Sequence, residues 1–238
     1  MREEINTLKK WIEESNSIVF FGGAGVSTES GIPDFRSVDG LYSQKYDYPP
    51  ETILSRSFFL SNPEEFYKFF KEKVMIAGAA PNKAHLRLAE LEKEGRLAGI
   101  VTQNIDGLHQ KAGSVNVLEF HGSAERYFCM ACRKKYSTDE VRNGTGAARC
   151  ECGGLIRPDV VLYEEPIDEA VAAGSVKLIQ NADMLIVGGT SLVVYPAAGL
   201  INYYRGKRLV IINKAVTSFD SRADLVINEK IGEVFGQV

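Results

Sequence analysis

The sequence predicts an α/β protein whose parallel sheet is covered by helices on both faces. Three observations predict this class. Six short apolar runs are typical of buried strands, helical stretches separate several of them, and the composition is that of a globular protein. The chain has 238 residues, of which 45% are hydrophobic and 25% charged, which is enough for one or two domains.

The six strands are expected where apolar residues follow one another without a helical period. The first, Ile18–Phe21, leads directly into a run of glycines. The others are expected at Gly99–Thr102, Val117–Phe120, Met184–Val187, Leu209–Ile212 and Leu225–Ile227. Strands that alternate with helices indicate βαβ units, in which neighbouring strands run parallel.

Helices are predicted from apolar periodicity and from capping residues. Ile5, Leu8 and Ile12 recur at helical spacing, which predicts a helix over residues 3–15. An asparagine before the first turn is a typical helix start. Further helices are therefore expected to begin at Asn62 and Asn82, and others to cover residues 168–180 and 196–204.

Two segments interrupt the alternation of strands and helices. Residues 37–80 contain helix and loop but no clear strand, and residues 122–155 contain all four cysteines. Both are expected to be insertions beside the main sheet. The predicted division is a large domain of residues 1–36, 81–121 and 156–238 and a small domain of residues 37–80 and 122–155.

Charge and hydropathy exclude several classes of protein. A net charge of −3 and a pI of about 5.8 argue against a strongly basic nucleic-acid binder. No apolar run of about 18 residues predicts a membrane span, and the first residues interleave charges where a signal peptide has an apolar core. We expect a soluble, cytoplasmic protein whose thiols stay reduced.

The four cysteines form two close pairs, Cys129 with Cys132 and Cys150 with Cys152. Tetrahedral zinc requires such pairs, and four thiolates fill its coordination shell, so the predicted ion is structural. The second pair has one intervening residue, and the two glycines that follow can relieve its tighter turn. Four unpaired structural thiols are the alternative.

A zinc ribbon can also bind nucleic acid, and Arg133, Lys134 and Lys135 offer a small basic cluster beside the first cysteine pair. Most such clusters are only solvated, so nucleic acid is not expected as a partner.

A glycine-rich turn, Phe21–Ser27, follows the first strand. Glycines let the backbone approach a pyrophosphate, and N–H groups at a helix start can hold its charge. The dinucleotide fingerprint is matched only in part, because Thr28 stands where its third glycine would be, so a plain turn is the alternative. Gly31–Arg36 follows with an aromatic residue, an acid and an arginine, which indicates a loop that covers a ligand.

Polar side chains follow two of the predicted strands. Thr102–Asp106 ends the second strand and His121 ends the third. The carboxyl ends of strands line the ligand crevice of open α/β sheets, and a histidine there can act as a general base. Each residue has a plain alternative: His121 as a hydrogen-bonded core residue, Asp106 as a helix cap and Asn104 as a turn residue.

Together these motifs resemble the sirtuins, protein-lysine deacylases that depend on NAD. The resemblance rests on the glycine turn, the covering loop, the polar run, the cysteine pairs, His121-Gly122 and Gly189-Thr190-Ser191. It extends from residue 17 to the C-terminus and is closest to the bacterial and archaeal members. It implies a Rossmann-type, doubly wound parallel sheet, a small domain made of a helical module and a zinc ribbon, and NAD in the crevice between them.

The resemblance also implies roles for residues that match the family's motifs. His121 would be the catalytic base, and Asn104 would position the ribose and a water. One structural zinc would be held by Cys129, Cys132, Cys150 and Cys152. An extended substrate peptide would pair with Val160, Val161, Leu162 and Tyr163 and with Leu192, Val193, Val194 and Tyr195. NAD would contact Ala24, Gly25, Thr28, Asp34, Phe35, Arg36, Gln103, Asn104, Ile105, Asp106, His121, Gly189, Thr190, Ser191, Asn213 and Ile231.

The implied activity is the NAD-dependent deacetylation of acetyl-lysine in proteins or peptides. Its products are deacetylated lysine, O-acetyl-ADP-ribose and nicotinamide, which is also expected to inhibit. The alternatives are a protein ADP-ribosyltransferase and a deacylase that prefers longer apolar acyl groups. No membrane partner is expected.

The acyl group is expected to be uncharged, with acetyl first. Sirtuins that prefer acidic acyl groups resemble one another in a Tyr-x-x-Arg pair after the covering loop. The best local match here is Phe70 with Lys73, which lack the phenol hydroxyl and the two-pronged guanidinium.

Overall fold

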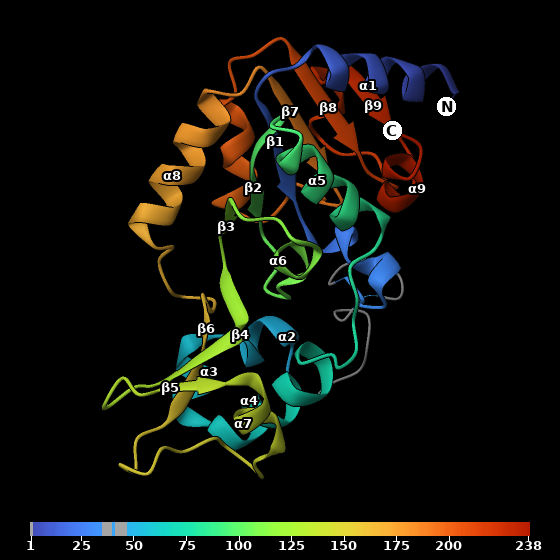
Figure 1. The fold of residues 1–238 in the computed structure, drawn as a ribbon. Helices are drawn as coiled ribbons and strands as arrows, with labels where there is room; N and C mark the ends of the chain where they lie inside the picture. Colours follow the sequence, from blue (N-terminus) through green and yellow to red (C-terminus); the bar gives the residue numbers. More distant parts are fainter. Residues whose placement is uncertain (1, 35–39, 41–46) are drawn as a thin grey trace.

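The computed structural model describes residues 2–34, 40 and 47–238, and this part of the chain forms two sheets (Figure 1). The larger sheet is parallel throughout, in the order β3-β2-β1-β7-β8-β9. All six strands predicted from the sequence are confirmed. They are β1 (Ile18–Gly22), β2 (Leu97–Thr102), β3 (Val117–Glu119), β7 (Met184–Gly188), β8 (Arg208–Ile212) and β9 (Leu225–Ile227).

Helices cover both faces of the larger sheet because its strands are apolar on both sides. Phe20 packs toward one face, and its neighbours Val19 and Phe21 pack toward the other. The first face is covered by α1 (Arg2–Glu14), α5 (Lys83–Lys93) and α9 (Ile231–Phe235). The second is covered by α8 (Glu169–Gln180) and η5 (Ala197–Tyr203). The result is the predicted three-layer α/β arrangement.

One predicted helix differs in type. Residues 196–204 form the 3₁₀-helix η5 rather than an α-helix. The segment begins after Pro196 and contains Gly199, and glycine inside a short helix disfavours regular α-helical geometry. Three further 3₁₀ turns are η1 (Ala24–Val26), η2 (Thr28–Ser30) and η6 (Asp220–Arg222).

The smaller sheet is antiparallel, in the order β5-β4-β6, and lies at the opposite end of the molecule from α1 (Figure 1). Its strands, β4 (Gly122–Cys129), β5 (Lys135–Ser137) and β6 (Ile156–Val160), are not among the strands predicted from the sequence. Helices complete this end: α2 (Pro50–Ile53), α3 (Arg56–Ser61), α4 (Pro63–Phe69), the π-helical turn η4 (Phe70–Val74) and α7 (Thr138–Asn143).

A separate apolar core holds this end together. Phe59, Phe66, Tyr67 and Phe70 pack there with Tyr127 and Ile156 from the sheet. We call this cluster the small-sheet core. The division into two domains stays a prediction, and strand pairing places residues 156–160 with the smaller sheet, because β6 pairs with β4.

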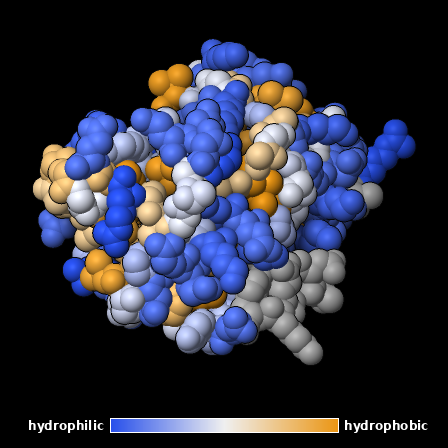
Figure 2. Space-filling view, turned by 90° about the horizontal axis from the view of Figure 1, so that it is seen from below, coloured by the Kyte–Doolittle hydropathy of each residue, from blue (hydrophilic) through white to orange (hydrophobic). Residues whose placement is uncertain are grey.

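No helix among the described residues is long and apolar enough to cross a membrane. The face of the molecule seen in Figure 2 is mostly hydrophilic where it is coloured, and its hydrophobic patches are small.

Candidate functional site

The order of the strands reverses beside β1. The chain builds β1, β2 and β3 toward one edge of the sheet and then returns to place β7 on the other side of β1. Open α/β sheets bind their ligands at such a reversal, outside the carboxyl ends of the strands. The glycine turn after β1 and Gly189 after β7 both lie there.

Backbone contacts between the two turns explain why glycines are required. Gly23 N donates to Gly188 O at 3.1 Å, and Gly25 N donates to Gly189 O at 2.8 Å. A β-carbon on Gly25 would lie 2.8 Å from the Cα of Gly189, and Gly189 has a φ of 59°. The backbone after β1 lies so close to the backbone after β7 that only glycine fits between them. This holds for a plain turn and for a ligand-binding turn alike.

Side chains from distant helices hold the glycine turn from behind. Asn82, the capping residue of α5, donates its Nδ2 to Val26 O at 2.7 Å and to Ser30 Oγ at 3.0 Å. Glu29 accepts a hydrogen bond from Gly232 N, at the start of α9, at 2.6 Å. These contacts fix the turn before any ligand arrives.

A polar cluster joins the end of β2 to this turn. Ser27 Oγ donates to Asp106 Oδ2 at 2.6 Å and accepts from Asn104 Nδ2 at 3.1 Å. Asp106 Oδ1 also accepts from Leu108 N at 2.9 Å, the first residue of α6 (Leu108–Ala112), whose N-cap residue is Gly107. No individual role is predicted for Ser27 from the sequence, because its partners lie 77 and 79 residues away.

Gln103 links the ends of three strands. Its Nε2 donates to Thr190 Oγ1 after β7 at 3.1 Å, and its backbone N donates to Gly22 O at the end of β1 at 2.9 Å. Its carbonyl oxygen lies 3.0 Å from Nδ1 of His121. One residue of the predicted NAD set therefore contacts the candidate base directly.

The hydrogen bond to Gln103 determines the tautomer of His121. A carbonyl oxygen only accepts, so Nδ1 carries the proton and Nε2 keeps its lone pair. Burial lowers the pKa of His121 below its usual 6.5, and the bond to Gln103 opposes this shift. The imidazole is therefore neutral at neutral pH, the form that a general base needs.

His121 lies where the chain passes from one sheet to the other, between β3 and β4. Gly122 has a φ of 75°, and a β-carbon there would lie 2.1 Å from Asp159 O on β6. His121 O also accepts from Val161 N at 3.0 Å. The candidate base and the predicted peptide segment are thus neighbours through their backbones.

The remaining predicted NAD contacts lie around this centre with different exposure. Thr28 and Ser191 are exposed, and Ala24, Asp34, Ile105 and Asn213 are half-buried. Ile231 is buried, with its side chain against Gly188. Phe35 and Arg36 lie outside the described residues.

The two predicted peptide segments expose apolar side chains. Tyr163 is 39% exposed, Val193 55% and Tyr195 69%, whereas Leu162 and Leu192 are buried. Exposed apolar groups of this kind are typical of a surface that receives another chain.

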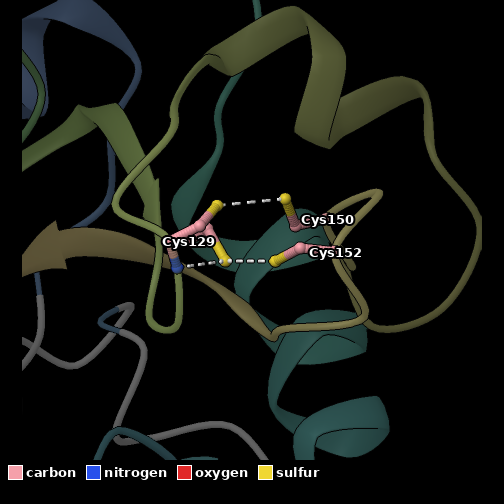
Figure 3. Close-up of side chains that lie close together, drawn as sticks. Cys129, Cys150 and Cys152 are labelled. Carbon is pink, nitrogen blue, oxygen red and sulfur yellow. Dashed lines mark hydrogen bonds between the residues drawn. The ribbon is translucent and has the colours of Figure 1, made fainter.

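The four cysteines lie together at the end of β4, with their sulfurs pointing toward one another (Figure 3). Cys129 Sγ lies 3.5 Å from Cys152 Sγ, Cys132 Sγ lies 3.6 Å from Cys150 Sγ, and all four lie within 4.8 Å of one another. Four sulfurs at about 2.3 Å from a zinc ion lie about 3.8 Å apart, so the cluster fits tetrahedral zinc.

The two glycines after Cys152 do relieve the tight turn. Gly153 has a φ of 84°, and a β-carbon on Gly154 would lie 2.7 Å from Cys129 Sγ. The basic cluster of the ribbon is largely engaged within the chain. The Arg133 guanidinium lies 4.1 Å from the centre of the Phe128 ring, and Lys134 pairs with Glu151 at 3.1 Å.

Two buried histidines lie behind the polar cluster. His85 on α5 and His109 on α6 have ring centres 4.8 Å apart. Three of their ring nitrogens have no hydrogen-bond partner among the described residues: Nδ1 and Nε2 of His109, and Nε2 of His85. Burial lowers the pKa of His85 from 6.5 to about 4, opposed by the Asp106 carboxylate, and burial lowers that of His109 to about 3.

This pair predicts a loss of stability in acid. Both imidazoles are neutral in the folded chain, whereas the unfolded chain binds protons near pH 6.5, so acid favours unfolding. We expect the free energy of unfolding to be fully retained above about pH 6.5 and to fall as the pH drops toward 4, by on the order of 2 kcal/mol per histidine at pH 5. Urea unfolding at several pH values measures this.

His109→Leu is the matched variant, since it removes one titrating group without leaving a partner unpaired. The free energy of unfolding of this variant should depend on pH less steeply than that of the wild type. The difference in slope between pH 6.5 and 5 should correspond to about one proton fewer bound on unfolding. Equal slopes for both proteins would contradict the assignment.

A cavity of about 320 Å³ lies away from these residues, between α6, β4 and α7. Its charged lining is paired internally, Lys111 with Glu125 at 3.0 Å and Arg142 with Asp139 at 3.4 Å. The chemistry-bearing residues lie at the sheet reversal instead.

The fold is that of an α/β protein whose glycine turns and polar cluster meet where the strand order reverses, with four clustered cysteines in its smaller part. The model of the Sir2 family matches residues 23–196. A curated "NAD-dependent protein deacetylase" of Clostridium perfringens is 57% identical and covers 100% of this chain and 99% of its own. A second "NAD-dependent protein deacetylase", from Clostridium acetobutylicum, is 56% identical, and the match covers 99% of this chain and 98% of that protein.

Solved structures agree. A Sir2 variant with deacetylated p53 peptide and 3′-O-acetyl-ADP-ribose superposes with a TM-score of 0.91 at 40% identity, covering 98% of this chain and 96% of that one. A Sir2 complex with p53 peptide and NAD⁺ has a TM-score of 0.87 at 41% identity, with the same coverage. This chain belongs to the Sir2 family.

Proposed function

We propose that the protein is an NAD-dependent protein-lysine deacetylase, which converts NAD and acetyl-lysine into nicotinamide, O-acetyl-ADP-ribose and lysine. One observation carries the proposal: a neutral imidazole, His121, bonded through Gln103 to the glycine turns at the strand reversal. The relatives bear the name of this activity, and the similar Sir2 complexes contain its substrates and products.

The glycine turn and Thr28 receive the pyrophosphate of NAD in this proposal, since glycines without side chains let the ligand approach the backbone closely. Gln103 and Asn104 contact the ribose beside His121. Ile105 and Asp106 line the nicotinamide side, where Asp106 is oriented by Ser27. On the adenosine side, the contacts are Gly189, Thr190, Ser191, Asn213 and Ile231, and Asp34, Phe35 and Arg36 complete the set.

NAD supplies the glycosidic carbon that the acetyl oxygen attacks as nicotinamide leaves. His121 Nε2, with its lone pair free, then accepts a proton from a ribose hydroxyl, and the oxygen of that hydroxyl attacks the acyl carbon. Water completes the cleavage that releases lysine and O-acetyl-ADP-ribose. Asn104 orients the ribose and the water, because its Nδ2 is already held by Ser27. The segments 160–163 and 192–195 hold the peptide by strand addition, and one zinc on the four cysteines has a structural role because no coordination position stays open.

The test is incubation with NAD and an acetyl-lysine peptide, with products identified by mass. We expect deacetylated peptide, O-acetyl-ADP-ribose and nicotinamide release that requires both substrates. A peptide that gains the mass of ADP-ribose would support the transferase instead, and faster turnover of long acyl chains would support the other alternative. No peptide-dependent nicotinamide release would contradict the proposal.

Acidic acyl groups are expected to be poor substrates. Phe70 is buried and stacks on Phe66 at 5.2 Å, and Lys73 pairs with Glu72 at 2.9 Å. Tyr67 also lies three residues before Phe70, but its hydroxyl donates to Ile156 O at 2.7 Å. Neither pair of residues at this spacing, Phe70 with Lys73 or Tyr67 with Phe70, supplies an arginine that could bind the carboxylate of an acidic acyl group. Acetyl-lysine peptide should therefore be turned over at least about tenfold faster than succinyl-lysine peptide, a difference of about 1.4 kcal/mol in the barrier.

The measurement is kcat/KM for two peptides that differ only in the acyl group. A higher value for the succinyl peptide would overturn this expectation.

We also propose that the protein acts in the cytoplasm, supported by four cysteines that form no disulfide.

A further inference from the structure

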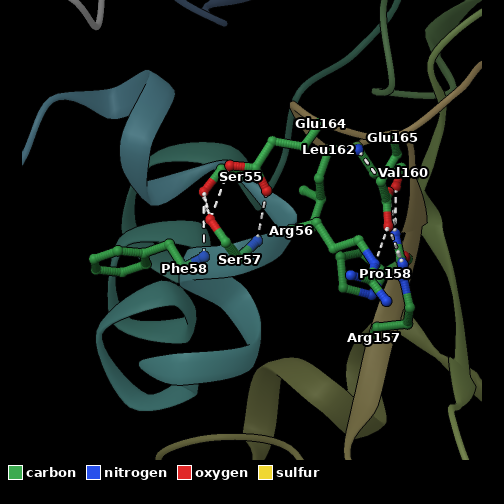
Figure 4. A network of polar contacts seen from close by, with 10 residues as sticks. All are labelled: Ser55, Arg56, Ser57, Phe58, Arg157, Pro158, Val160, Leu162, Glu164 and Glu165. Carbon is green, nitrogen blue, oxygen red and sulfur yellow. Dashed lines mark hydrogen bonds and ion pairs between the residues drawn. The ribbon is translucent and has the colours of Figure 1, made fainter.

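An ion pair contacts the backbone of segment 160–163, the part of the chain predicted to bind the substrate peptide (Figure 4). The guanidinium of Arg157 on β6 donates from Nη1 and Nη2 to the two carboxylate oxygens of Glu165, at 2.7 and 2.8 Å. Each side chain is only 13% exposed. Such a two-pronged pair is geometrically specific, and a lysine cannot reproduce it.

Both members of the pair also bind the backbone of the segment. Arg157 Nη2 donates to Val160 O at 2.8 Å, and Glu165 Oε2 accepts from Leu162 N at 2.9 Å. The pair therefore fixes one carbonyl and one N–H within three residues, beside Val161, whose N–H is bonded to His121 O. The backbone next to the base cannot shift without breaking its hydrogen bonds to Arg157 or Glu165.

The same loop is attached to α3 on its other side. Tyr163 N donates to Leu54 O, and Arg56 N donates to Tyr163 O, both at 3.0 Å. Glu164 accepts from Ser57 N at 2.9 Å and from Ser57 Oγ at 2.8 Å, although its own φ is 75°. A left-handed backbone at a residue other than glycine costs free energy, so the loop is held in one conformation by contacts on both sides.

Stability alone does not account for a half-buried ion pair. Replacing such a pair by apolar residues of similar volume is often neutral or stabilising, because removing two charges from water is costly. The contacts to Val160 and Leu162 give the pair a different task. We propose that Arg157 and Glu165 are positioning residues that fix the segment 160–163 for the acetyl-lysine peptide, an inference that rests on the proposed function.

Kinetics of Arg157→Lys and Glu165→Gln test the proposal. For both variants we expect the KM and the directly measured Kd for acetyl-lysine peptide to rise at least about tenfold, the equivalent of about 1.4 kcal/mol. The KM for NAD and kcat should change less than about threefold, because the polar cluster at Ser27 is untouched. Unchanged peptide KM and Kd would overturn the proposal.

A double variant, Arg157→Met with Glu165→Leu, separates positioning from stability. Apolar packing should restore the melting temperature toward that of the wild type, while the peptide Kd stays raised because the bonds to Val160 and Leu162 are missing. Recovery of peptide affinity together with stability would show a merely structural role and overturn the proposal.

Arg208→Lys is the matched control, since Arg208 pairs with Glu14 on the far side of the larger sheet. It should leave the peptide KM unchanged even if it lowers the melting temperature. Failure of the proposed function is distinguishable, because the wild type would then release no nicotinamide with acetyl peptide.

Discussion

Replacing His121 by alanine is expected to lower NAD-dependent deacetylation at least about 100-fold, the lower end of what a general base contributes. The imidazole is placed for this role by its bond to Gln103 O, which leaves Nε2 as the basic atom. His121→Gln should lose as much, because an amide can hydrogen-bond but cannot take the proton. Steady-state kinetics with saturating NAD and peptide measure both variants.

Binding and folding measurements keep this prediction interpretable. The alanine variant loses one hydrogen bond, worth about 1 kcal/mol, so its melting temperature should fall by only a few degrees. Its zinc content and its affinity for acetyl peptide should be near those of the wild type, because the cysteines and segment 160–163 are unchanged. Near-wild-type turnover by a folded, zinc-loaded variant would refute the role of His121.

Loss of the metal is expected to have an effect of similar size. Cys150→Ala, or removal of zinc by a chelator, should abolish deacetylation and unfold the ribbon. Structural zinc contributes about 10–16 kcal/mol to the folding of small zinc domains, as much as the whole stability of a typical protein. Cys129 ends β4, and β4 begins at Gly122 beside His121, so disorder that starts at the cysteines reaches the site along one strand.

The zinc-to-protein ratio, deacetylase activity and circular dichroism measure this together. The larger sheet should stay folded, since its two cores contain no cysteine. Lys134→Ala is the control on the same ribbon, where an exposed pair with Glu151 is lost and zinc is retained. A metal-free protein with full activity would show that the ion has no part in holding the site.

The larger sheet is predictable from the sequence because its strands are buried on both faces and read as continuous apolar runs. The smaller sheet is not. In β4 the run GSAERYFC mixes glycine, charge and aromatics, β5 has three residues, and β6 contains Arg157, Pro158 and Asp159. These strands are specified by pairing and by the small-sheet core, which only the folded chain brings together.

The candidate site divides in the same way. The glycine turn, the polar run, His121 and the cysteine pairs have short-range signatures, and they lie where the sequence places them. The partners of Ser27, the contact of His85 with His109, and the hold of Arg157 and Glu165 on the peptide segment depend on packing between distant elements. Their spacing carries no local signal, so the geometry of the fold is needed to find them.

The crossing from one sheet to the other has a consequence for how this protein can vary. Any missense change of a single base in the codon for Gly122 adds a β-carbon, and that atom would meet the backbone oxygen of Asp159. A substitution at Gly122 therefore disturbs the backbone beside His121 and the backbone of β6 together. Gly122 pairs with Val160, so a residue that pushes Asp159 away also displaces the backbone beside His121.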